Sequence, residues 1–265
     1  MKLPVFATVA DAWRELIHDW RIFVRLSAIP VAIQVVGTAL LALGAPEPGP
    51  DAVGIDPGAV LRALLYSIAL WLLLVPAITA WHRHVLLGPG ERPAHPGYHL
   101  GLPEWRYVKK SILVAVAGSL IAIAIGTPLM ILAAVFGGGM AGDRDVIGAP
   151  VAIAIPALVF LVLIDWALVF PAAALDRSLA LGEARRLGRG NRLRLAAVLV
   201  LAYLPQVILS HLVGAIVVAV LGDALASPVG RTIALLAQML TQYAFLAVTV
   251  GALSFSWLKL SARAD

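Results

Sequence analysis

The chain has 265 residues, 61% of them hydrophobic and 13% charged, and its mean hydropathy of +0.94 excludes an ordinary soluble domain, which is about half apolar and a quarter charged. The net charge of +5 is of the kind that basic loops beside membrane spans produce, so it does not call for nucleic-acid binding. Cysteine is absent, which excludes disulfides, thiol nucleophiles and thiolate metal sites.

The apolar residues form long blocks along the chain. Each block has about 20 residues, the length of a helix that crosses roughly 30 Å of hydrocarbon. The blocks do not alternate between apolar and polar residues, which excludes a transmembrane β-barrel. We therefore predict an all-α polytopic membrane bundle that forms a single domain over 1–265. The expected transmembrane helices are six, at about 22–43, 60–80, 111–136, 151–174, 195–221 and 232–258.

Residues 1–21, before the first span, have a different pattern. Apolar residues recur there at helical spacing, and acidic and basic residues occupy the other face. This pattern predicts an interfacial amphipathic helix lying on the membrane, with Trp13 and Trp20 at the level of the lipid headgroups. A helix that caps the end of the bundle would have the same pattern, and the sequence does not separate the two.

The basic residues are distributed unevenly between the two sides of the predicted bundle. They gather before the first span, after the second and fourth spans, and in the tail, whereas Arg62, Arg144 and Arg231 lie toward the other side. Cytoplasmic loops collect Lys and Arg, so both termini are expected in the cytoplasm. The abundance of Arg, Ala, Gly and Pro favours a bacterial protein, and hence a multi-pass protein of the inner (cytoplasmic) membrane.

Asp165 lies inside the fourth apolar block. A carboxylate within a span costs roughly 2.5–3.5 kcal/mol on insertion scales, so it is expected to face protein or water. One hypothesis is a proton or cation site for transport. A second is a structural ion pair with a base near the inner face, such as Arg25, Lys110 or Arg194. The transport hypothesis would draw on further polar residues of the predicted spans, namely Gln206, His211, Gln238 and Gln242.

An arginine-rich loop follows the fourth span. Residues 178–195 are predicted to form an amphipathic helix whose basic face meets anionic lipid headgroups, each base contributing on the order of 1 kcal/mol. The alternative is a loop that only sets the membrane orientation. The candidate lipid-binding residues are Arg185, Arg186, Arg189, Arg192 and Arg194.

Signatures of metal binding and of catalysis are not found. His82 and His84 are two apart, which on a helix points them in different directions. His95 and His99 are separated by Pro96, and no acid completes a zinc set in the sequence pattern. The motifs GxSxG, HExxH and Walker A do not occur. We predict no metal, no cofactor and no enzymatic activity.

The run WALVFPAAALDRSLALGEARRLGRGNRLRL resembles a group of six-span bacterial membrane proteins. They are similar to the membrane domain of some glycerophosphodiester phosphodiesterases and to YciC-like proteins, of the uncharacterised alphaproteobacterial type. In that group a proline ends a span and a polar helix follows, with a basic-Leu-x-x-Gly phrase that Arg186, Leu187 and Gly190 fill here. The resemblance implies the fold and an inner-membrane location. It implies no phosphodiesterase activity, because that activity belongs to a soluble domain.

Two functional hypotheses follow. The first is a non-enzymatic scaffold or envelope-associated protein that contacts the bilayer and its anionic headgroups through the arginine loop. The second is a small solute or ion transporter with Asp165 as its coupling site.

Overall fold

The computed structural model describes residues 2–44, 57–88, 100–137 and 144–262, and within these ranges the chain is helical, without a strand. Six helices are long and apolar enough to cross a membrane. This confirms the predicted all-α class and the predicted number of candidate spans. They cover Trp20–Leu40, Val60–Leu86, Leu102–Leu129, Ala154–Ala174, Arg192–Leu225 and Val229–Ser261.

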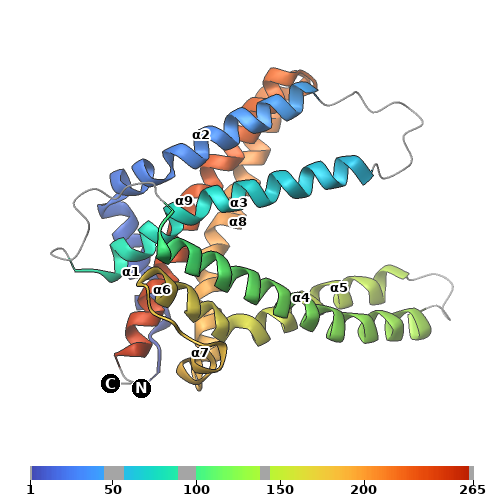
Figure 1. The fold of residues 1–265 in the computed structure, drawn as a ribbon. Helices are drawn as coiled ribbons and strands as arrows, with labels where there is room; N and C mark the ends of the chain where they lie inside the picture. Colours follow the sequence, from blue (N-terminus) through green and yellow to red (C-terminus); the bar gives the residue numbers. More distant parts are fainter. Residues whose placement is uncertain (1, 45–56, 89–99, 138–143, 263–265) are drawn as a thin grey trace.

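The spanning helices pack as antiparallel neighbours: α2 (Trp20–Gly44) with α3 (Pro57–Leu86), α4 (Leu102–Gly137) with α5 (Arg144–Leu163), and α8 (Arg192–Leu221) with α9 (Pro228–Ser261). The pairs converge where both termini, α1 (Val5–His18), α6 (Val169–Ala174) and α7 (Leu181–Gly188) lie, and they spread apart toward the other end (Figure 1). We call the first end proximal and the second end distal.

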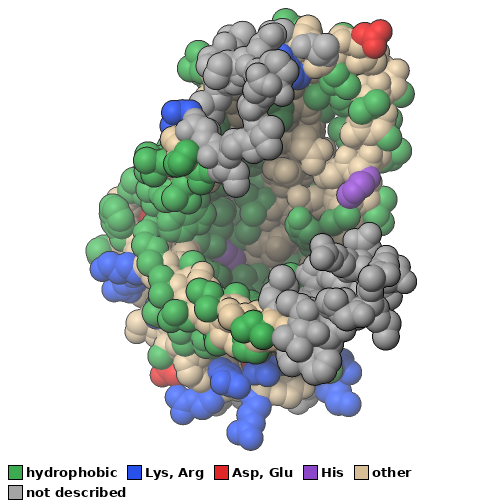
Figure 2. All heavy atoms as spheres, turned by 90° about the vertical axis from the view of Figure 1, so that its right-hand side faces the viewer, with side chains coloured by type: hydrophobic (Ala, Val, Ile, Leu, Met, Phe, Trp, Pro, Cys, Tyr) green, Lys and Arg blue, Asp and Glu red, His purple; other side chains and the backbone are tan. Residues whose placement is uncertain are grey.

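The packed core lies at the proximal end. Leu168, Val169, Leu195, Val198 and Val248 are fully buried there. Large apolar side chains in the distal halves of the helices are instead exposed, and Figure 2 shows a hollow with largely hydrophobic walls. Burial of apolar side chains against one another therefore holds the helices together mainly at the proximal end. The exposed apolar surface further out is of the kind that suits hydrocarbon.

Helix α1 covers part of the proximal end. Thr8 and Ala12 on one face are buried, and the helix packs against α9 and α8. Phe6 and Ile17 on the other face are 79% and 69% exposed. This packing agrees with the cap alternative, while contact of the exposed face with a membrane surface stays a prediction.

The two tryptophans expected at headgroup level differ in their environment. Trp13 packs edge-to-face on Phe245 of α9, with ring centroids 5.4 Å apart, so it joins α1 to the bundle. Trp20 is 52% exposed and remains a candidate for the headgroup region.

The fourth span is not one continuous α-helix, contrary to the expectation over 151–174. Helix α5 ends at Leu163, a 3-10 segment, η1 (Ile164–Leu168), follows, and α6 completes the span. The reason is Pro171. A regular helix through it would lose the hydrogen bond to the carbonyl of Ala167 and bring the ring against that carbonyl. Pro171 lies instead in the first turn of α6. Backbone N–H groups in a first turn have no partner within the helix, so the absence of an N–H on Pro171 costs no hydrogen bond there.

The helix predicted over 178–195 is also wrong in extent. Helix α7 ends at Gly188, and α8 begins at Arg192. Gly190 in the intervening turn has a φ of +79°, a left-handed conformation that glycine adopts readily and that ends helices. The second and third spans are longer than expected, because α3 continues to Leu86 and α4 already begins at Leu102.

Candidate functional site

Asp165 forms an ion pair with Arg192 at the proximal end. Its side chain is 2% exposed, and that of Arg192 is 38% exposed. Arg192 donates from Nε at 2.8 Å and from Nη2 at 2.6 Å to the same oxygen, Oδ2. This contact agrees with the second of the two hypotheses for Asp165, a structural ion pair, but the partner is Arg192 and not Arg25, Lys110 or Arg194.

The second oxygen of Asp165 faces Gly188 of α7. A Cβ placed on Gly188 would lie 2.4 Å from Oδ1, and Oδ1 has no hydrogen-bond partner among the described residues. Because the glycine has no side chain, α7 can approach η1 closely enough to cover the carboxylate. The 3-10 segment, α7 and the start of α8 thus form one polar joint.

The five candidate lipid-binding arginines fall into two groups. Arg192 binds Asp165, and Arg194 donates from Nη1 to the carbonyl of Leu3 at 3.0 Å. Arg185, Arg186 and Arg189 are exposed, and none of them forms an ion pair within the described ranges. Two of the five predicted residues therefore have internal partners, and three project from α7 and the turn after it.

Bases from two other helices bind the segment between α6 and α7. Arg83 donates to the carbonyl of Ala174 at 3.3 Å, and Lys110 donates to that of Leu179 at 2.8 Å. Arg106 donates to the backbone carbonyl of Asp176 and pairs with its carboxylate at 2.7 Å. Asp176 itself has a φ of +61°. These three bases belong to the side of the bundle that the sequence predicted to be basic, and they hold the segment before α7 in position.

Helix α7 presents opposite faces to the protein and to its surroundings. Ala184 and Gly188 are buried against η1. At its first turn Glu183 accepts a hydrogen bond from the N–H of Ala180 at 2.8 Å, which satisfies a donor that the helix leaves open. Arg185 and Arg186 then lie on the outward side.

Two of the polar residues of the transport hypothesis lie far from Asp165 along α8. At a rise of about 1.5 Å per residue, Gln206 and His211 lie roughly 20 and 30 Å along α8 from Arg192. His211 is exposed, and its Nδ1 lies 2.7 Å from the carbonyl of Val207 on its own helix. On α9, Gln238 is half-buried and Gln242 is exposed.

The cavity that adjoins η1 is apolar. It has a volume of about 500 Å³ and lies between α4, α5, α6 and α8. Its walls include Val114, Phe160, Leu163, Phe170 and Leu199, and every lining residue is hydrophobic. Such a cavity does not supply the polar groups that a hydrated ion or a polar solute requires.

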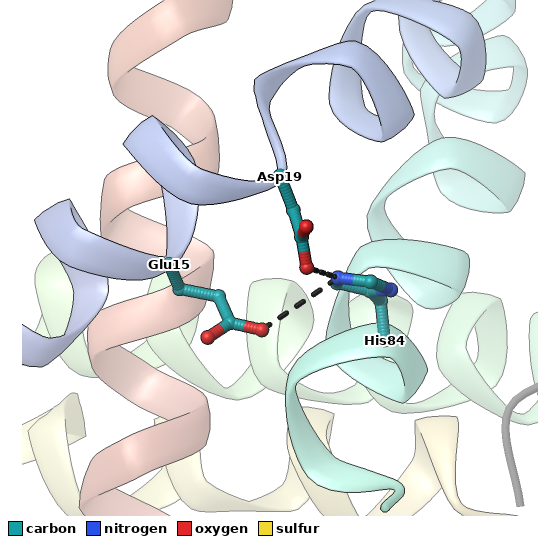
Figure 3. Close-up of side chains that lie close together, drawn as sticks. All are labelled: Glu15, Asp19 and His84. Atoms are coloured by element: carbon teal, nitrogen blue, oxygen red, sulfur yellow. Dashed lines mark hydrogen bonds and ion pairs between the residues drawn. The ribbon is translucent and has the colours of Figure 1, made fainter. Parts of the chain in front are cut away.

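His82 and His84 lie in the part of α3 that extends beyond the predicted end of the second span. The sequence did not predict their contacts. His82 is fully buried, with Nδ1 2.7 Å from the hydroxyl of Ser254. Nε2 of His84 lies 2.6 Å from Asp19 Oδ2 and 3.6 Å from Glu15 Oε1 (Figure 3). The two histidines point to different partners, as predicted. However, His84 contacts Glu15 and Asp19, which lie 65 or more positions earlier in the chain. A spacing pattern in the sequence cannot indicate a contact between such distant residues.

Comparison of the chain with family models, with curated proteins and with solved structures gave no match.

Proposed function

We propose that this chain is a non-enzymatic, multi-pass protein of a bacterial inner membrane that binds anionic lipid headgroups through α7 at its proximal end. The observation that carries the proposal is the exposure of Arg185, Arg186 and Arg189 on an element that the protein holds rigidly. Both termini share this end of the molecule, and in the proposed orientation this end faces the cytoplasm.

The position of α7 supports this proposal. Its buried face packs on η1, and the segment before it is bound by Arg83, Arg106 and Lys110. The headgroup-facing side chains would therefore be presented without first ordering the backbone, which lowers the entropic cost of binding. In Figure 2, Lys and Arg side chains gather at the lower edge, at the level of α7 and the termini in Figure 1.

Three exposed bases are enough for a measurable preference of the protein for anionic over neutral lipid. At about 1 kcal/mol per base near an anionic surface, together they contribute roughly 3 kcal/mol. If the contributions add, this corresponds to a preference on the order of 100-fold over a neutral lipid at low salt.

The proposal is tested by thermal unfolding of the purified protein in micelles, with added phosphatidylglycerol or phosphatidylcholine. We expect phosphatidylglycerol to raise the melting temperature of the wild type more than phosphatidylcholine does. The variant R185Q/R186Q/R189Q should lose most of that difference. The control variant R21Q/R25Q/K109Q removes three exposed bases from other helices and should retain most of it. Equal losses in the two variants would contradict a site on α7.

Transport through Asp165 is the less supported hypothesis. The carboxylate is bound by Arg192, the neighbouring cavity is apolar, and Gln206 and His211 lie further along α8. We therefore propose a structural role for Asp165.

A further inference from the structure

Glu15, Asp19 and His84 form a compact cluster away from the arginine surface. Glu15 comes from α1, Asp19 from the junction between α1 and α2, and His84 from the last turns of α3, and their side chains point toward one another (Figure 3). One donor atom from each lies within 4.8 Å of the others. Two carboxylates and one imidazole therefore converge on a single small volume.

We propose that this cluster binds a divalent first-row metal ion such as Zn²⁺. Zinc takes imidazole nitrogen and carboxylate oxygen at about 2.0–2.2 Å, which places neighbouring tetrahedral donors about 3.3 Å apart. The distances from His84 Nε2 are 2.6 Å to Asp19 Oδ2 and 3.6 Å to Glu15 Oε1. For each of these two donor pairs, a shift below about 1 Å would give the spacing of neighbouring zinc ligands. The ion would replace the proton between His84 and Asp19.

The charges and the accessibility of the cluster fit such an ion. Two carboxylates with a neutral imidazole balance the double positive charge of the metal. The side chains of Glu15 and Asp19 are 23% and 18% exposed, whereas that of His84 is 7% exposed. The metal would therefore enter from the side of the acids, and the imidazole would form the inner wall.

The histidine is held in place by its neighbours. Its ring stacks on Trp81, with centroids 5.2 Å apart and planes 16° apart. Trp81 is itself fixed, because its Nε1 donates to the carbonyl of Ala247 at 2.9 Å and its ring packs edge-to-face with that of Phe23. A ligand whose orientation is fixed in this way loses little freedom on binding a metal.

Asp19 lies at a break between two helices that contains no proline or glycine. Asp19, between α1 and α2, has non-helical backbone angles of φ −111° and ψ 27°. The N–H groups of Ile22 and Phe23 donate to its carbonyl, so α2 begins at once. His18 is 83% exposed, and its Nε2 lies 4.0 Å from Asp19 Oδ1.

Isothermal titration of the metal-free, purified protein with ZnCl₂ tests this site, with MgCl₂ as a comparison. We expect one zinc ion to bind per wild-type chain. Glu15→Gln and Asp19→Asn should each weaken zinc binding at least about tenfold, and magnesium should give no comparable binding. Both variants keep the size and polarity of the side chain, so the fold is retained even if His84→Gln proves unstable.

The matched control is Asp11→Asn. Asp11 also lies on α1, but it pairs with Lys259 at 2.6 Å, outside the cluster. Asp11→Asn should bind zinc as the wild type does. The proposal is overturned if the wild type binds no zinc, if Glu15→Gln and Asp19→Asn bind it unchanged, or if Asp11→Asn weakens binding equally. None of these outcomes depends on lipid binding by α7.

Discussion

At the scale of single residues, the close approach of Gly188 to Asp165 decides how α7 is seated. Any side chain at position 188 would meet the carboxylate of Asp165, which is already bound to Arg192. Gly182, in the first turn of the same helix, has nothing within 4 Å of the position that a Cβ would take. The two glycines therefore have different roles in one short helix.

We predict that Gly188→Ala destabilises the protein by about 1–3 kcal/mol, because the added methyl group displaces Asp165 or α7. Gly182→Ala should be neutral or slightly stabilising, since alanine favours helix by up to about 1 kcal/mol over glycine. Thermal unfolding of both variants in the same detergent measures the difference. A Gly188→Ala variant as stable as the wild type would show that α7 does not pack on Asp165.

The ion pair between Asp165 and Arg192 makes a second residue-scale prediction. Arg192→Gln leaves the buried carboxylate without its charged partner, and breaking a buried pair costs about 3–5 kcal/mol. We expect the lower end of that range or less, because Arg192 is partly exposed. The double variant D165N/R192Q should be more stable than R192Q alone in chemical unfolding. If the second change added to the loss, the pair would not be coupled.

At the scale of elements, α1 is attached through small residues and polar anchors. Ala12 faces Gly251 of α9, and a Cβ built on that glycine would lie 3.4 Å from the Cβ of Ala12. Lys259 reaches Asp11, and Asn191 accepts from the N–H of Leu3 at 2.7 Å. The first and last segments of the chain are thus joined at one end of the bundle.

We predict that Ala12→Leu loosens α1, because the larger side chain does not fit against α9, at a cost of about 1–3 kcal/mol. Hydrogen–deuterium exchange over residues 5–18 should rise in this variant. Ala10→Leu is the control, since Ala10 is exposed on the same helix, and its exchange should match that of the wild type. Unchanged exchange in Ala12→Leu would contradict the packing of α1 on α9.

At the scale of the whole molecule, basic residues at the proximal end fall into two groups. Arg83, Arg106, Lys110, Arg192 and Arg194 bind carbonyls or carboxylates. They fix the elements around α7 and leave the arginines of α7 itself exposed. A count of charges by side describes both groups alike, although only the first group binds other parts of the protein.

The parts of the fold that the sequence predicted are those that depend on local composition. Six apolar blocks of membrane-spanning length were sufficient for the all-α class and the number of candidate spans. The break at η1 was missed, although Pro171 marked its place, because a proline in a span can also be accommodated within a helix, as Pro76 is in α3.

The site residues depend on contacts between distant segments, and the sequence predicted these less well. The spacing did not indicate that Arg192 would turn toward Asp165, because the turn at Gly190 was read as helix. Nor could spacing bring Glu15 and Asp19 to His84, since the contact depends on how α1 packs across the bundle. The lipid-binding role, the orientation in the membrane and the resemblance to the YciC-like group remain predictions.

Lipid recognition by α7 is tested most directly by the equilibrium preference of the protein for anionic lipid, measured by quenching of its tryptophans with brominated phosphatidylglycerol and brominated phosphatidylcholine. We predict that phosphatidylglycerol binds more tightly to the wild type than phosphatidylcholine does, and that R185Q/R186Q/R189Q reduces the ratio of the two binding constants toward one. A ratio of one in the wild type, or an unchanged ratio in the variant, would contradict lipid recognition by α7.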